Sequence, residues 1–123
     1  MASHERQLKS AFAHMRVNQE DAPLLQKGQF TVFDFLEHAF SFSPKRRQLA
    51  ADVLEILREK PRTFSVLLKQ TSAPKSALFG VLLSLKNSGL IDKKEGGFFE
   101  LSGRFSEILN AYAGFWKRYV GTS

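Results

Sequence analysis

The fold of this chain is decided by residues 72–102, which read SAPKSALFGVLLSLKNSGLIDKKEGGFFELS. Ser72 and Pro74 predict a helix start, because a serine side chain accepts hydrogen bonds from free amides and proline fits the first turn. Gly89 predicts the end of that helix, since glycine readily adopts the left-handed conformation that closes helices. We therefore expect a helix over residues 73–88, with its apolar residues on the buried face.

Two short strand candidates follow this helix, at residues 91–94 and 98–101. The sequence Glu95-Gly96-Gly97 between them favours a tight hairpin, because glycine tolerates the positive φ angles of such turns. A hairpin that carries Lys93 and Lys94 therefore comes directly after the helix.

Two further helices precede residue 72. Ser43 and Pro44 predict a helix over residues 44–60, and Pro61 ends it because the residue before a proline disfavours helical geometry. Thr63 then caps a short helix over residues 64–70. The order is thus helix, short helix, helix and hairpin.

Both ends of the chain carry helical patterns as well. Residues 3–17 space apolar side chains by three and four and predict a short amphipathic helix, and residues 18–29 read as an irregular connector. Thr31 and Asp34 form a capping-box pattern at the start of a second helix of about ten residues. An apolar stripe over residues 103–119 predicts a long last helix.

The 123 residues allow one core, and the net charge of +6 is unevenly distributed. Residues 1–43 hold four Lys/Arg and five Asp/Glu, whereas residues 44–123 hold fourteen and seven. The excess of Lys/Arg over Asp/Glu in residues 44–123 favours an anionic partner, although a solvated basic surface is the alternative. The absence of cysteine excludes disulfides and thiolate sites, and no run is long enough to cross a bilayer, so we expect a cytoplasmic protein without membrane contact.

The order and spacing of these elements resemble a winged helix-turn-helix domain over residues 44–102, and TSAPKSALFGVLLSLKNSGLI is similar to that family's common run. The chain looks most like regulators of the MarR/ArsR kind. The phenylalanine-rich TVFDFLEHAFSFS and the aromatic last helix are similar to those of the small dimeric archaeal winged-helix transcription regulators. The resemblance implies a mainly α fold with a small β-hairpin, an N-terminal helical extension over residues 1–43 and a C-terminal dimerisation helix over residues 103–123.

The resemblance also implies that the protein is a transcription regulator that binds double-stranded DNA. Residues 73–88 would be the recognition helix in the major groove, and residues 92–98 the wing on the minor groove or backbone. The DNA-binding candidates are Thr71, Ser72, Lys75, Ser76, Phe79, Lys93, Lys94, Arg104, Lys45, Arg46 and Arg47. Thr71 and Ser72 would hold a phosphate at the helix start, and Phe79 would touch a thymine methyl or pack on a second protomer.

A homodimer is expected because the apolar stripe of the last helix is too long for the small domain to cover. The dimerisation candidates are Phe12, Phe33, Ile108, Leu109, Tyr112, Phe115, Trp116 and Tyr119. The helix over residues 73–88 is apolar almost all round, which leaves two other functions open. These are a protein–protein adaptor and a chromosome-coating protein that binds DNA without sequence preference.

Nothing in the sequence indicates an enzyme, a cofactor or a metal site. The three histidines are scattered, and no zinc, phosphate-loop or dinucleotide motif occurs. Carboxylate pairs such as Asp34 and Glu37 lie one helical turn apart, which is usual for a solvated surface.

Overall fold

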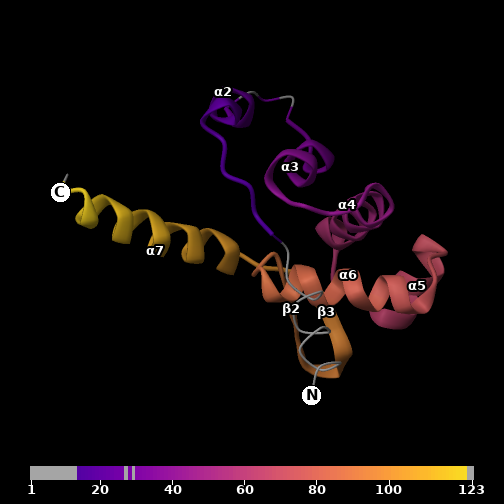
Figure 1. Ribbon diagram of the computed structural model, residues 1–123. Coiled ribbons are helices and arrows are strands. Elements are labelled where there is room, and N and C mark those ends of the chain that lie inside the picture. The colour runs from indigo at the N-terminus through magenta and orange to yellow at the C-terminus, as the bar shows by residue number, and fades with distance from the viewer. Residues whose placement is uncertain (1–13, 27, 29, 122–123) are drawn as a thin grey trace, which may run out of the picture.

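The computed structural model describes residues 14–26, 28 and 30–121, and its fold is mainly helical with a small three-stranded antiparallel sheet (Figure 1). The elements follow in the order η1 (Gln19–Asp21), α2 (Ala22–Leu25), α3 (Val32–Ala39), α4 (Pro44–Glu59), β1 (Arg62–Thr63), α5 (Phe64–Thr71), α6 (Lys75–Asn87), β2 (Ile91–Lys93), η2 (Glu95–Gly97), β3 (Phe98–Leu101) and α7 (Arg104–Tyr119). The predicted mainly α fold with a β-hairpin is confirmed at this level.

Local capping groups fix several helix ends as the sequence predicted. The Ser43 hydroxyl accepts a hydrogen bond from the Arg46 amide at 3.4 Å, and Thr63 caps α5 in the same way. Each bond satisfies one of the amides that the first turn of a helix leaves without a partner. Gly89 has a φ of 84°, so the left-handed residue after α6 is also confirmed.

The sheet has the strand order β1-β3-β2, so β3 is the central strand. Ile91 pairs with Leu101 and Lys93 with Phe99 in the predicted hairpin, and Gly96 and Gly97 have the expected positive φ. Strand β1 was not predicted, because it is only two residues long and sequence periodicity needs a longer run. It nevertheless joins the segment before α5 to the hairpin.

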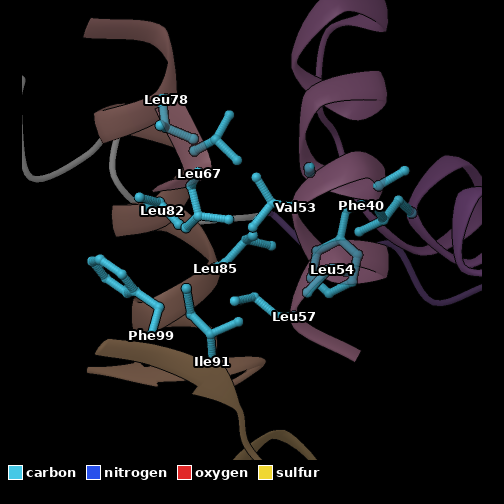
Figure 2. Packing of buried hydrophobic residues seen from close by; sticks show 14 of the residues in the cluster. Phe40, Val53, Leu54, Leu57, Leu67, Leu78, Leu82, Leu85, Ile91 and Phe99 are labelled. Carbon is cyan, nitrogen blue, oxygen red and sulfur yellow. The ribbon is translucent and has the colours of Figure 1, made fainter. Parts of the chain in front are cut away.

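The core lies between α4 and α6, with the sheet below it (Figure 2). Helix α6 contributes Leu78, Leu82 and Leu85, which face Val53 and Leu57 of α4. Ile91 and Phe99 close the core from the hairpin. Burial of these side chains stabilises the fold by roughly 1.5–3 kcal/mol each and fixes the orientation of α6.

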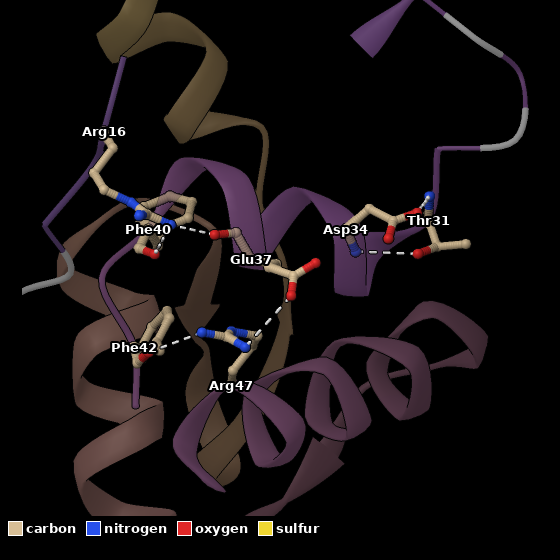
Figure 3. Close-up of polar contacts among 7 residues, drawn as sticks. All are labelled: Arg16, Thr31, Asp34, Glu37, Phe40, Phe42 and Arg47. Atoms are coloured by element: carbon tan, nitrogen blue, oxygen red, sulfur yellow. Dashed lines mark hydrogen bonds and ion pairs between the residues drawn. The ribbon is translucent and has the colours of Figure 1, made fainter. Parts of the chain in front are cut away.

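Helix α3 belongs to the same core. Leu36, Ala39 and Phe40 are buried, and the Phe40 ring packs against Phe35 and Phe105. The predicted capping box is confirmed: the Thr31 hydroxyl accepts from the Asp34 amide, and the Asp34 carboxylate accepts from the Thr31 amide, each at 3.1 Å (Figure 3).

The predicted helix over residues 3–17 is wrong in its described part. Met15 pairs with Phe40 in an isolated antiparallel bridge, and Arg16 hydrogen-bonds to the carbonyls of Glu37 and Phe40 (Figure 3). This pairing gives hydrogen-bond partners to the backbone groups next to Phe40. They would lack these partners if Met15 and Arg16 formed a separate helix. Phe12 and the rest of the predicted helix lie outside the described residues.

The connector predicted to be irregular contains η1 and α2. Pro23 was interpreted as a breaker, but proline is also favourable in the first turn of a helix, and here it lies at the start of α2. Helix α7 extends away from the body formed by the other helices (Figure 1).

Candidate nucleic-acid interface

The turn between α5 and α6 depends on Ser72, which has a left-handed φ of 54°. The prediction that Ser72 caps α6 is wrong, because Ser72 ends α5 and its amide donates to the Leu68 carbonyl at 3.0 Å. Helix α6 starts at Lys75 after Pro74, and no side chain caps its first turn. Those first amides are therefore open to an acceptor from outside.

Thr71 is half-buried and its hydroxyl serves the turn. It donates to the Leu67 carbonyl at 2.8 Å and accepts from the Ala73 amide at 3.4 Å. Ala73, between Ser72 and Pro74, packs against the core. Ser72 is exposed and lies three residues before the start of α6.

The outer face of α6 begins with three exposed side chains, Lys75, Ser76 and Phe79. Phe79 is 60% exposed, which is unusual for a ring of this size. Beside it, a Cβ added to Gly80 would lie 3.8 Å from Nη2 of Arg46. The Arg46 guanidinium, from the first turn of α4, therefore lies against the α6 backbone next to Phe79.

A hollow of about 630 Å³ lies between α6 and the hairpin, and Phe79 lines it. Arg46 and Gly80 are not among its lining residues. Its apolar wall includes Phe64, Leu82, Leu83 and Phe99 as well as Phe79. Three lysines also line it, namely Lys75, Lys86 and Lys93. The cations of the start of α6, the end of α6 and the hairpin thus share one concave surface.

Lys86 was missed in the sequence analysis. Residues 75, 79, 82, 83 and 86 repeat at the spacing of one helical face, and this spacing is the signal that could have identified it. The winged-helix resemblance implies base contacts from the first turn of the recognition helix, whereas Lys86 lies in the last turn of α6.

The hairpin divides its charges between two faces. Lys93 lies on the same face as Phe99, with its ammonium 5.8 Å from the ring centroid. Asp92 and Glu100 pair across the hairpin on the opposite face, because successive side chains of a strand alternate.

The other two basic candidates near the hairpin are held by those carboxylates. Lys94 lies 3.7 Å from Glu100, and Arg104 lies 3.6 Å from Asp92. In both pairs the cation is exposed and the carboxylate is partly buried at the surface, so each pair stabilises the fold by at most about 1 kcal/mol. Either cation can therefore exchange its carboxylate for another anion at small cost.

The three basic residues at the start of α4 have different surroundings. Lys45 is exposed and Arg46 reaches α6, as described above. The Arg47 side chain is only 19% exposed; it lies 3.7 Å from the Glu37 carboxylate and donates to the Phe42 carbonyl at 3.4 Å (Figure 3). Arg47 therefore holds α3 against α4.

The expected dimerisation residues of α7 form one exposed stripe. Tyr112, Phe115, Trp116 and Tyr119 are each at least 59% exposed, and the Tyr119 ring stacks on those of Phe115 and Trp116. Ile108 and Leu109, nearer the body, are more covered. Phe33 differs from this group, because it packs on the chain's own core below the Arg47 guanidinium.

Hydrogen bonds to the amide and hydroxyl of Thr31 hold the pKa of Asp34 below its ordinary value, because they stabilise the ionised carboxylate. Within the described ranges, no three His, Cys, Asp or Glu side chains are grouped so as to hold a metal ion. Over the same ranges, no helix is both long enough and apolar enough to cross a membrane.

Comparison with known proteins gives no match for this chain, whether to family models, to curated proteins or to solved structures.

Proposed function

We propose that this protein is a winged helix-turn-helix regulator that binds double-stranded DNA as a homodimer. In this proposal α5 and α6 form the helix-turn-helix, α6 enters the major groove, and the β2–β3 hairpin is the wing. The strand order β1-β3-β2, with β1 placed between α4 and α5, supports the winged-helix assignment.

The observation that carries the proposal is the arrangement of cations around the exposed face of α6. Lys75, Lys86 and Lys93 line the hollow on one side of Phe79, and Arg46 lies on the other side at Gly80. Cations on both sides of the exposed face of α6 fit the two phosphate backbones that border a major groove. Each lysine or arginine that contacts a phosphate releases counterions and makes the affinity dependent on salt.

The start of α6 is a second feature that favours the binding of phosphate. Its first amides lack a side-chain cap, and helix N-termini attract phosphate groups. Ser72 and Ser76 are exposed near this end and can donate to the same phosphate. Thr71 acts through the turn, because its hydroxyl is bonded to the backbone.

The wing contributes less charge than its sequence suggests. Lys93 faces the hollow, but Lys94 and Arg104 are paired with Glu100 and Asp92, and Glu95 is exposed at the tip. A carboxylate at the tip opposes close approach to phosphates. We therefore assign most of the binding free energy to α6 and Arg46.

The α7 stripe supports the homodimer. Its aromatic side chains repeat along one face of a helix that extends from the body, and a second copy would remove this patch from water (Figure 1). Two-fold symmetry would then place two α6 helices on one side of the duplex, about 34 Å apart if they read successive turns. Bound in this way, the dimer would regulate transcription by covering promoter DNA.

Fluorescence anisotropy of a labelled duplex at several salt concentrations tests the DNA binding. We expect the affinity to fall steeply with salt, and Lys75→Ala, Lys93→Ala and Arg46→Ala each to reduce the salt slope by about 1. Lys60→Ala is the matched control, because it removes the same charge at the far end of α4, about 21 Å from Arg46. Absence of binding in dilute buffer would overturn the proposal.

A protein–protein adaptor is the second candidate function, and the exposed Phe79 beside an apolar hollow favours it. An aromatic anchor next to a pocket is typical of protein interfaces. The adaptor hypothesis predicts no anisotropy change with any duplex. A chromosome-coating protein would bind every duplex with similar affinity, so competition between unrelated sequences separates it from a regulator.

A further inference from the structure

The hollow between α6 and the hairpin has the size and the lining of a small-molecule site. Its volume of about 630 Å³ lies inside the range of about 300–1,000 Å³ that ligand pockets occupy. Leu82 and Phe99 at its base are almost fully buried, whereas Phe79 and Leu83 form its more open side. No Asp or Glu is among the described residues that line it.

The lysines restrict the charge of an occupant. Lys75 and Lys86 stand at the two ends of α6, about 16 Å apart along the helix axis, with the apolar residues between them. Lys93 is placed next to the buried base, because its ammonium lies over the Phe99 ring. A ligand with an apolar body and one anionic head can fill the apolar part while its head pairs with Lys93.

We infer that this hollow binds an amphipathic monoanion, that is, an alkyl chain or aromatic body with a carboxylate head. The apolar body would lie along Phe79, Leu82 and Leu83, and the carboxylate would pair with Lys93. The α7 stripe of a second copy fits less well, because Arg118 flanks its aromatic residues in the last turn of α7 and would approach the lysines of the hollow.

If the proposed function holds, a ligand in the hollow would also affect DNA binding. The ligand would cover Phe79 and neutralise Lys93, both on the surface assigned to DNA. It would therefore compete with the duplex. The binding of the anion itself does not depend on that function.

Sodium decanoate, kept below its micelle concentration, is the probe. Titration into the ¹⁵N-labelled full chain should give saturable shifts in the amides of residues 63–65, 79–86 and 96–99. Decyltrimethylammonium, which has a similar apolar body and the opposite charge, should bind at least about tenfold more weakly. Equal binding of the two probes, or decanoate shifts confined to the α7 residues 108–120, would overturn the inference.

Two variants locate the contacts. Lys93→Gln should weaken decanoate about tenfold, since a charge-assisted hydrogen bond is lost, and Lys60→Gln should leave its affinity unchanged. Leu83→Glu should abolish binding by placing a carboxylate in the hollow. Because Lys93 is exposed, its variant tests the site even if Leu83→Glu fails to fold. Unchanged affinity in Lys93→Gln would overturn the assigned head-group position.

Competition against a labelled duplex separates this inference from the proposed function. Release of DNA by decanoate, and not by decyltrimethylammonium, supports both. Decanoate binding by a chain that never binds DNA sustains the site and overturns the regulator. Normal DNA binding with no saturable decanoate shifts overturns the site alone.

Discussion

Helices α3 and α7 both carry aromatic-rich apolar faces, but only α3 is covered by its own chain. Leu36 and Ala39 of α3 are buried, and Phe33 and Phe35 pack around the same core. Helix α7 has no buried residue, and its aromatic side chains are exposed along most of its length. An apolar stripe therefore predicts that a helix needs a partner, but it does not predict whether that partner is the same molecule.

The difference between the two helices follows from how each is connected. Residues 40–43 return the chain directly from α3 to α4, and Met15 and Arg16 hold the end of α3 from the other side. Helix α7 is anchored near its start, where Phe105 packs against Phe35 and Phe40. Beyond Ile108 it leaves the body, so its stripe is free for a second molecule.

The largest expected effect tests the covered helix. Phe40→Ala should lower the free energy of unfolding by about 3–5 kcal/mol, because it removes a fully buried ring that three other phenylalanines contact. Urea unfolding measures the loss. The loss should be the same at low and high protein concentration, because Phe40 packs inside one chain.

Phe115→Ala on α7 is the matched comparison for that variant. Under the proposed homodimer its effect should grow with protein concentration, because its own chain supplies the Tyr119 ring and a second copy would supply the rest of the cover. A loss of several kcal/mol in dilute solution would show that α7 is covered within one chain.

The next effect concerns association. Phe115→Glu/Trp116→Glu should raise the dimer dissociation constant at least about 30-fold, equivalent to about 2 kcal/mol, because it places two charges in an apolar interface. Sedimentation velocity measures the dimer. Asn110→Glu is the control, since residue 110 lies on the opposite side of the helix from residues 108, 112, 115 and 119. A wild-type chain that sediments as a monomer would contradict the dimer.

Most of the fold could be predicted because local signals mark its boundaries. Ser43, Thr63, Gly89 and the Thr31–Asp34 box act on residues within one helical turn, so their effect is visible in the sequence. Strand β1 and the pairing of Met15 with Phe40 depend on residues more than twenty positions away. No local pattern reports such contacts.

The candidate site was predicted only in part for a similar reason. The spacing of α6 located Lys75 and Phe79, and the same spacing would have located Lys86. The neighbouring Arg46 and Arg47 are alike in sequence, but one lies against α6 and the other against Glu37. The hollow itself requires the hairpin to fold back beside α6, which composition does not show.

A smaller effect separates those two arginines. Arg47→Ala should lower the free energy of unfolding by about 1–2 kcal/mol, because it leaves the half-buried Phe42 carbonyl without its donor. Its effect on the salt dependence of DNA binding should be absent. Arg46→Ala should do the reverse and reduce the salt slope by about 1 while stability stays within about 0.5 kcal/mol. Parallel unfolding and anisotropy measurements check both, and a lowered slope in Arg47→Ala would contradict the division.

The smallest effect is a pH dependence at the start of α3. The Thr31 amide, which donates to the Asp34 carboxylate, and the neighbouring Thr31 hydroxyl hold the pKa of Asp34 below its ordinary value, so the folded state binds the proton more weakly than the unfolded state. The capping box should therefore contribute fully above the ordinary Asp range, near pH 4, and lose its contribution as the pH falls through the lower pKa of the folded state. Urea unfolding of the wild type and of Asp34→Ala between pH 7 and pH 3 should show a difference that shrinks with acid. A difference that stays constant would mean that the Asp34 carboxylate does not stabilise α3, and that the packing of Leu36 and Phe40, with the contacts of Arg16 and Arg47, keeps this helix on the body while α7 extends from it.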